Sequence, residues 1–139
     1  MASEPSSGRI TGSCACGRVR FSATNPEATV HCYCTTCRKT SGAAYLPFAH
    51  FREDNIRWEN EPDKWAKSDN ATRAYCATCG SCISMSYHGD PEIGIAVGCI
   101  DEGVDLINPV KMCIYVREKP AWAQLPQGVP AFDGGSTEG

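Results

Sequence analysis

The stretch His31-Cys32-Tyr33-Cys34-Thr35-Thr36-Cys37 places three cysteines within six residues. Two cysteine pairs stand apart from it, Cys14-Ala15-Cys16 near the beginning and Cys76-Ala77-Thr78-Cys79 in the middle of the chain. A disulfide between cysteines one or two residues apart closes a strained ring, whereas such cysteines can readily share one metal ion. The three clusters therefore indicate metal binding by thiolates.

Local geometry allows the sulfurs of each cluster to meet. Residues i and i+2 of an extended segment face the same side, so a CxC pair can share an ion. A CxxC spacing is a turn that brings two sulfurs onto one metal, and Gly80 helps the chain leave the last of these turns. Within this pattern, His31 would face away from Cys32, which weakens it as a further ligand.

The number of clustered cysteines predicts two different sites. A structural zinc takes four ligands, while a catalytic zinc takes three and keeps one position open. Seven sulfurs divide into four and three, and the simplest pairing joins the isolated CxC to the distant CxxC. This predicts a structural zinc on Cys14, Cys16, Cys76 and Cys79, and a catalytic zinc on Cys32, Cys34 and Cys37.

Composition narrows the class of protein. The 139 residues (15.0 kDa) are enough for one domain with one modest core. A formal charge of -3 without a stripe of Lys and Arg argues against nucleic acid as the main partner. There is no apolar run of membrane-spanning length and no basic or apolar leader. We therefore expect a cytoplasmic protein, away from membranes, whose thiols stay reduced and available to metal.

The pattern of short alternating segments predicts a mainly β fold. We expect a single zinc-binding domain over residues 9–129, flanked by disordered tails at 1–8 and 130–139, which are small and polar. The stretch that follows Cys37 has the character of one helical turn. The predicted strands, mostly antiparallel, cover residues 18–22, 44–49, 56–58, 71–75, 83–87, 93–97 and 112–116.

In this order, the clusters and their flanks resemble the glutathione-dependent formaldehyde-activating enzyme family, also called the centromere protein V-like family. The resemblance runs through residues 12–21, 31–42, 75–80, 97–101 and 119–122. It implies a β-tent fold of stacked antiparallel sheets stapled by a structural zinc. It also implies the four-cysteine and three-cysteine zinc sites reached above by counting ligands.

Two positions depart from the family pattern. Cys113 stands where members commonly carry a histidine, and Cys99 where they often carry Thr or Ser. If that histidine assists the chemistry, its loss favours a specialised substrate over formaldehyde. Cys82, Cys99 and Cys113 are otherwise small side chains of the kind that fill a core. Cys113 is the best candidate for a thiol that lines the active pocket.

A zinc ion on three thiolates is a weak Lewis acid, because the site carries a net charge of about -1. Such a site suits an incoming thiol better than a hydrolytic water, since the metal deprotonates the thiol and leaves its sulfur nucleophilic. We therefore expect a carbon–sulfur lyase-type enzyme that makes or breaks a bond between a thiol, glutathione, and a carbonyl or related electrophile. Arg38 and Lys39 are candidates to hold a glutathione carboxylate.

Two other functions fit the same clusters. One is a non-catalytic zinc module that binds a protein partner and has two saturated sites. The other is a zinc enzyme that acts on a larger metabolite without glutathione, for which the cysteines at positions 99 and 113 are the only indication. The response of the metal to an added thiol distinguishes the first of these from an enzyme with an open site. The sequence does not set the oligomeric state or the identity of the electrophile.

Overall fold

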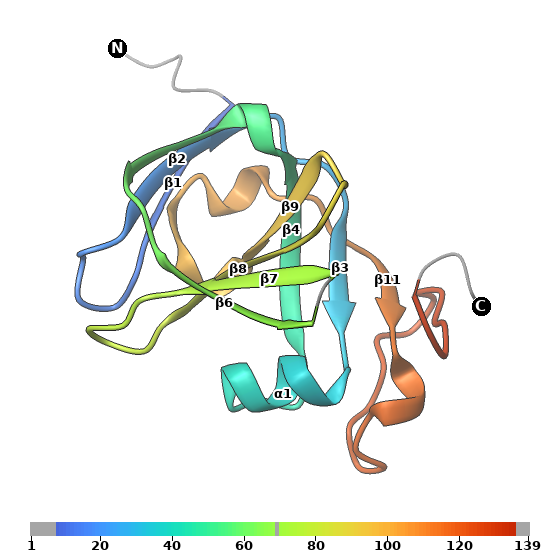
Figure 1. The fold of residues 1–139 in the computed structure, drawn as a ribbon. Helices are drawn as coiled ribbons and strands as arrows, with labels where there is room; N and C mark the ends of the chain where they lie inside the picture. The colour runs from blue at the N-terminus through green and yellow to red at the C-terminus, as the bar shows by residue number, and fades with distance from the viewer. Residues whose placement is uncertain (1–7, 69, 136–139) are drawn as a thin grey trace.

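The computed structural model describes residues 8–68 and 70–135 and consists of two β-sheets packed against each other (Figure 1). The smaller sheet has the strand order β10-β1-β2-β5. The larger sheet has the order β11-β3-β4-β9-β8-β7-β6. Every pairing is antiparallel except that of β11 with β3. The stacked, mainly β architecture confirms the predicted fold class.

The strands are short and follow one another through tight connections. In chain order they are β1 (Arg9–Ser13), β2 (Arg20–Thr24), β3 (Thr29–Cys32), β4 (Leu46–Arg52), β5 (Ile56–Asn60), β6 (Asp63–Ser68), β7 (Ala71–Tyr75), β8 (Cys82–Tyr87), β9 (Glu92–Ala96), β10 (Ile100–Glu102) and β11 (Val110–Ile114). The helix α1 covers Thr35–Ser41, and four 3-10 helices cover Glu53–Asn55 (η1), Val97–Cys99 (η2), Val104–Leu106 (η3) and Val116–Glu118 (η4).

The core lies between the two sheets. The smaller sheet contributes apolar side chains that alternate with polar ones along β1 and β2, and the larger sheet contributes residues of β4, β8 and β9. Gly12 on β1 permits the closest approach, because a Cβ atom there would lie 2.2 Å from the ring of Phe21. The fully buried large side chains include Ile10, Val19, Phe21, Phe48, Phe51, Ile83 and Ile95.

The seven predicted strands all correspond to observed strands, with ends shifted by a few residues. The prediction misses β1, β3, β6 and β10. The sequence of β6, Asp63-Lys-Trp-Ala-Lys-Ser68, has no clear alternation, and this strand lies at the edge of its sheet, where it pairs only with β7. The helical turn expected after Cys37 begins earlier, at Thr35, because the sulfur of Cys34 caps the helix by accepting from the Cys37 amide at 3.2 Å.

The chain after the last strand is held against β11. The sequence predicts a flexible tail from residue 130, but residues 130–134 exchange backbone hydrogen bonds with Cys113, Tyr115 and Val116 at 2.9–3.1 Å. These bonds satisfy backbone groups of β11 on the side opposite β3, which would otherwise form an open sheet edge. The outer parts of both predicted tails, residues 1–7 and 136–139, lie outside the described residues.

Among the described residues, no helix has the length and apolar character needed to cross a membrane.

Candidate metal centres and active site

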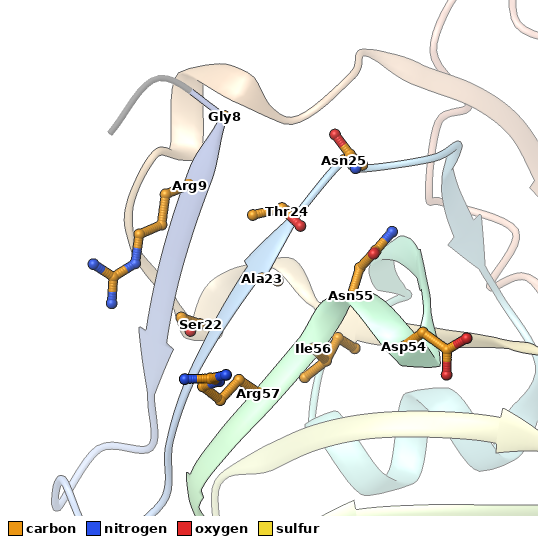
Figure 2. Close-up of a pocket in the computed structure, with 10 residues that line it drawn as sticks. All are labelled: Gly8, Arg9, Ser22, Ala23, Thr24, Asn25, Asp54, Asn55, Ile56 and Arg57. Carbon is orange, nitrogen blue, oxygen red and sulfur yellow. The ribbon is translucent and has the colours of Figure 1, made fainter. Parts of the chain in front are cut away.

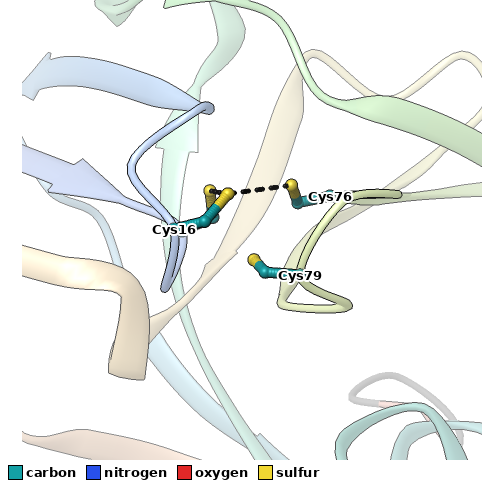
Figure 3. Close-up of side chains that lie close together, drawn as sticks. Cys16, Cys76 and Cys79 are labelled. Atoms are coloured by element: carbon teal, nitrogen blue, oxygen red, sulfur yellow. Dashed lines mark hydrogen bonds between the residues drawn. The ribbon is translucent and has the colours of Figure 1, made fainter.

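Four cysteines from two distant loops meet at one point. Their sulfur atoms all lie within 4.8 Å of one another, and they come from the turn after β1 and the turn between β7 and β8. Figure 3 shows the sulfurs of Cys16, Cys76 and Cys79 directed toward one another from these two turns. The group consists of Cys14, Cys16, Cys76 and Cys79, the set predicted for the closed site.

The sulfur separations fit a tetrahedral zinc. The Sγ atoms of Cys14 and Cys16 are 3.6 Å apart, and those of Cys16 and Cys76 are 3.8 Å apart. A zinc with bonds of about 2.3 Å to four sulfurs separates those sulfurs by about 3.8 Å. A disulfide, by contrast, requires about 2.05 Å between the sulfurs. The donor type, number and spacing therefore match a closed zinc site.

Polar contacts hold the two turns of this cluster in place. The Ala15 amide donates to Oγ of Ser81 at 2.9 Å, and the Ser81 hydroxyl also lies 3.2 Å from Sγ of Cys79. The hydrogen bond with Ser81 lowers the pKa of Cys79 to about 5. On the other side, Arg18 forms an ion pair with Asp63. The cluster thus ties the smaller sheet to the β7–β8 turn of the larger one.

The other three cysteines form a second, separate group. The sulfurs of Cys32, Cys34 and Cys37 lie within 4.8 Å of one another, where the end of β3 leads into α1. Cys32 and Cys37 are buried, whereas Cys34 is partly exposed. Since these sulfurs lie within this distance, they can share a metal ion, and the partly exposed sulfur gives a ligand from solution a way to approach.

An arginine that the sequence analysis did not select lies against this group. Arg73 of β7 donates from Nη1 and Nη2 to Sγ of Cys37, both at 3.6 Å, and from Nη2 to Sγ of Cys34 at 4.0 Å. Arg73 is 36 positions from Cys37 in the sequence, so this contact is made only by the folded chain. The alternation of residues 71–75 predicts a strand and therefore the side of that strand on which Arg73 lies. It does not predict that Arg73 contacts Cys37.

The surroundings of Cys34 favour its thiolate. Hydrogen bonds from the side chains of Cys32 and Cys37 lower the pKa of Cys34, and the nearby Arg73 adds to this. Cys32 has a raised pKa, because it donates within the same group and is buried. Glu118 of η4 accepts from the Thr35 amide at 2.7 Å, and so fixes the first turn of α1 against the C-terminal segment.

Cys113 does not join the three-sulfur group. It is the partner of His31 in the parallel pairing of β11 with β3, whereas Ile114 is the partner of Cys32. Because side chains alternate along a strand, Cys113 lies on the face of the sheet opposite to Cys32. Burial raises the pKa of the Cys113 thiol, although a hydrogen bond with Tyr33 partly offsets this. The placement expected for a thiol in the active pocket is therefore not observed.

The predicted orientation of His31 agrees with the structure. Its ring stacks on Tyr45 with centroids 4.5 Å apart, on the side away from the three sulfurs. Arg38 and Lys39 both lie in the last turn of α1. The Arg38 guanidinium donates to Thr35 at 3.4 Å, while Lys39 is exposed. The role of these two side chains in holding a thiol co-substrate stays a prediction.

Two cavities differ in their relation to the cysteines. A cavity of about 800 Å³ lies at the smaller sheet and is formed by parts of β1, β2, η1 and β5 (Figure 2). Its described lining includes Arg9, Arg57 and Asp54 but no cysteine or histidine, so this lining offers no thiolate or imidazole ligand. A cavity of about 330 Å³ shares Arg73 with the three-sulfur group. Of these two cavities, the smaller one is bordered by a residue that contacts the three sulfurs.

The model for the family described as glutathione-dependent formaldehyde-activating enzyme matches residues 9–118. The chain belongs to this family. The match spans both cysteine clusters and Arg73, so the glutathione-dependent formaldehyde-activating enzyme domain contains the whole site described above. Family membership, together with a relative named as a lyase, identifies the chain as a lyase-like enzyme.

The relatives described below share only about a quarter or less of their residues with this member of the glutathione-dependent formaldehyde-activating enzyme family. A Halomonas elongata protein named "Putative glutathione-dependent formaldehyde-activating enzyme" is 27% identical over 129 residues, covering 84% of this chain and 80% of its own length. A Schizosaccharomyces pombe protein named as an uncharacterized lyase is 26% identical over 77 residues, and the match covers 55% of this chain and 56% of that protein. The crystal structure of a Rhodobacter sphaeroides protein superimposes with a TM-score of 0.56 at 21% identity, covering 88% and 98% of the two chains. This last likeness shows the fold alone.

Proposed function

We propose that this protein is a zinc-dependent carbon–sulfur lyase-type enzyme that joins glutathione to a carbonyl substrate, or separates the two. Cys32, Cys34 and Cys37 would hold the catalytic zinc, and the four-cysteine group the structural zinc. The observation that carries the proposal is the difference between the two sulfur groups, one with four sulfurs and one with three. A tetrahedral metal is saturated in the first and keeps one position for a thiol in the second.

Zinc suits both donor sets, because thiolates are ligands that select zinc over hard cations such as magnesium or calcium. When bound to three thiolates and an incoming thiol, zinc supplies the charge that keeps the thiol ionised at neutral pH. The chain's own groups define the rest of the site. Cys34, the partly exposed member, lies on the side from which a small thiol can arrive.

Arg73 changes the electrostatics expected from the cysteines alone. Three thiolates and a divalent ion carry a net charge of about -1, which a guanidinium 3.6 Å from Cys37 offsets. Its donors also withdraw electron density from the sulfurs of Cys37 and Cys34. We infer that Arg73 holds these two sulfurs and raises the affinity of the site for an anionic thiolate.

The reaction needs no oxidant or further co-reactant. The glutathione sulfur forms a bond with the carbonyl carbon as the C=O π bond breaks, and the proton given up by the thiol ends on the former carbonyl oxygen. The product is a hemithioacetal, and the reverse reaction is the lyase direction. A site that binds both reactants side by side accelerates the addition, because it holds the sulfur and the carbonyl carbon in the orientation that the reaction needs.

The test is the response of a cobalt-substituted protein to glutathione. Cobalt(II) in a thiolate site absorbs in the visible range, and a new sulfur ligand changes the intensity and position of these bands. We expect a saturable change with glutathione and none with S-methylglutathione, which lacks the free thiol. A protein loaded with two cobalt ions whose spectrum ignores glutathione would contradict an open site, and would favour the non-catalytic zinc module.

A further inference from the structure

The cavity of about 330 Å³ borders Arg73, the residue that contacts the three-sulfur group. Arg73 forms part of its wall, and the guanidinium of the same residue is 3.6 Å from Sγ of Cys37. A molecule in this cavity is therefore separated from the sulfurs by no more than one side chain. The volume lies at the lower end of the range for small-molecule sites, about 300–1,000 Å³. It is suited to a small organic group and is too small for a protein segment.

Aromatic side chains form the open part of the wall. Trp65 is 44% exposed and Tyr75 is 37% exposed. Trp65 is the cross-strand partner of Arg73, and Tyr75 follows Arg73 by two residues on the same strand. All three side chains therefore project from one face of the β6–β7 hairpin. Large aromatic rings left exposed around a cavity are typical of a binding site, since their apolar faces are otherwise in contact with water.

The two sides of the cavity are anchored by the cysteine groups. Tyr75 directly precedes Cys76, and Gly80 directly follows Cys79, so this side is fixed by the four-sulfur group. On the other side, Thr40 lies one turn after Cys37 on α1, where its hydroxyl donates to the Thr36 carbonyl at 2.8 Å. A wall held in this way is formed before a ligand arrives, which lowers the cost of binding.

We propose that this cavity binds the non-reacting part of the carbonyl substrate, and that this part is a flat apolar group such as a phenyl ring. The proposal rests on the proposed function, because it places the substrate next to a thiol at the three-sulfur group. Among the described residues that line the cavity, Arg73 is the only charged side chain, so this part of the wall offers no carboxylate to bind a cationic substituent. Formaldehyde, with no substituent, would leave Trp65 and Tyr75 without a contact.

The chemistry is the same addition as above. With the ring between Trp65 and Tyr75, the carbonyl group lies toward Arg73, and an N–H of the guanidinium donates to the oxygen as negative charge develops on it. The carbon–sulfur bond forms while the C=O π pair moves to that oxygen, which then takes up the proton released by the thiol. The guanidinium keeps its own protons throughout.

The test compares phenylacetaldehyde with acetaldehyde in the zinc-loaded full chain with saturating glutathione. Exchange between each aldehyde and its hemithioacetal is measured by two-dimensional NMR exchange spectroscopy, corrected for the uncatalysed rate. We expect kcat/KM for phenylacetaldehyde to exceed that for acetaldehyde at least tenfold. Trp65→Ala and Tyr75→Ala should each reduce the phenylacetaldehyde value about tenfold and the acetaldehyde value by a smaller factor, so that the preference for phenylacetaldehyde falls. Trp122→Ala is the matched control, because Trp122 is 76% exposed and does not line the cavity.

Binding of 2-phenylethanol, an unreactive analogue, gives a readout that does not depend on turnover. Its Kd, from NMR chemical-shift changes, should rise about tenfold in Trp65→Ala and stay unchanged in Trp122→Ala. Exchange of both aldehydes with equal kcat/KM, and equal 2-phenylethanol binding by all variants, would overturn the cavity assignment and leave the proposed function intact. Absence of enzyme-dependent exchange for both aldehydes would overturn the proposed function, and the substrate class with it.

Discussion

The guanidinium of Arg73 lies with both Nη atoms 3.6 Å from Sγ of Cys37. These hydrogen bonds would be strongest with the Cys37 sulfur ionised by a bound metal, because they would then be assisted by charge. The positive charge of Arg73 would therefore offset the net negative charge of the three-sulfur group with its metal, although Arg73 would not be a ligand of the metal. These hydrogen bonds connect β7 to α1, although three strands separate the two elements in the sequence.

Replacing Arg73 should weaken metal binding at the three-sulfur group without unfolding the protein. Groups that orient metal ligands from outside typically contribute 10–100-fold in metal affinity. We expect Arg73→Gln to lower the zinc affinity of this site by about that factor, and Arg73→Lys to lower it less, since charge is kept but the second donor is lost. Competition with a chelator measures this affinity. Equal affinities in Arg73→Gln and the wild type would contradict the role given to Arg73.

Cys34→Ser should abolish activity and remove one of two metal ions while most of the fold remains. A serine hydroxyl is a far poorer zinc ligand than a thiolate, and the four-sulfur group lies on other segments of the chain. Metal analysis and circular dichroism of the purified variant measure both effects. Retention of two ions with unchanged turnover would show that the three-sulfur group is not catalytic.

Cys79→Ser, unlike Cys34→Ser, should reduce the stability of the fold, so that little soluble, folded protein is obtained. The four-sulfur group joins the turn after β1 to the turn after β7, so its metal-binding energy is folding energy. Cys82→Ser serves as the control, because Cys82 lies three residues away on β8 and belongs to neither sulfur group. Thermal unfolding and metal content of the two variants are compared. Normal stability and full metal content in Cys79→Ser would refute the structural assignment.

Gly12→Ala should destabilise the domain by about 1–3 kcal/mol, the usual cost of forcing a methyl group into a packed core. The added Cβ would lie 2.2 Å from the Phe21 ring and 2.7 Å from the Cys99 carbonyl oxygen, which is backbone and cannot easily move aside. Gly98→Ala is the matched control, since a Cβ there meets nothing within 4 Å. Urea unfolding measures both. Equal stability of the two variants would show that β1 and η2 can separate freely.

His31 and His50 should both titrate below pH 6.5 in the folded protein. Burial lowers the pKa of each imidazole, and for His50 the nearby Glu92 offsets only part of this effect. Below pH 6.5 the unfolded chain then binds more protons than the folded one, so the free energy of unfolding falls as the pH is lowered. NMR titration of the imidazole C2 protons gives the pKa values directly. A pKa above 6.5 for either residue would contradict this prediction.

The sequence by itself determined which cysteines belong together. The CxC and CxxC spacings are local, so their ability to converge follows from strand and turn geometry, and four-ligand saturation then pairs residues 14–16 with residues 76–79. The alternation of polar and apolar residues likewise predicted seven strands. The alternation of side chains along a strand predicted that His31 faces away from Cys32. The strands and the face of His31 depend on neighbours within a few positions of the chain, whereas the pairing of the two distant clusters depends on the number of ligands that a closed zinc site needs.

Only the tertiary structure decided what surrounds the three-sulfur group. Arg73 meets Cys37, and Glu118 meets Thr35, because the fold brings β7 and the segment after β11 to α1. The parallel pairing of β11 with β3 likewise set Cys113 beside His31 and thus away from the sulfurs. Pairing register between distant strands is fixed by the packing of the whole core. A shift of one residue would exchange the two faces of a strand, and no turn connects β3 to β11 to fix their register.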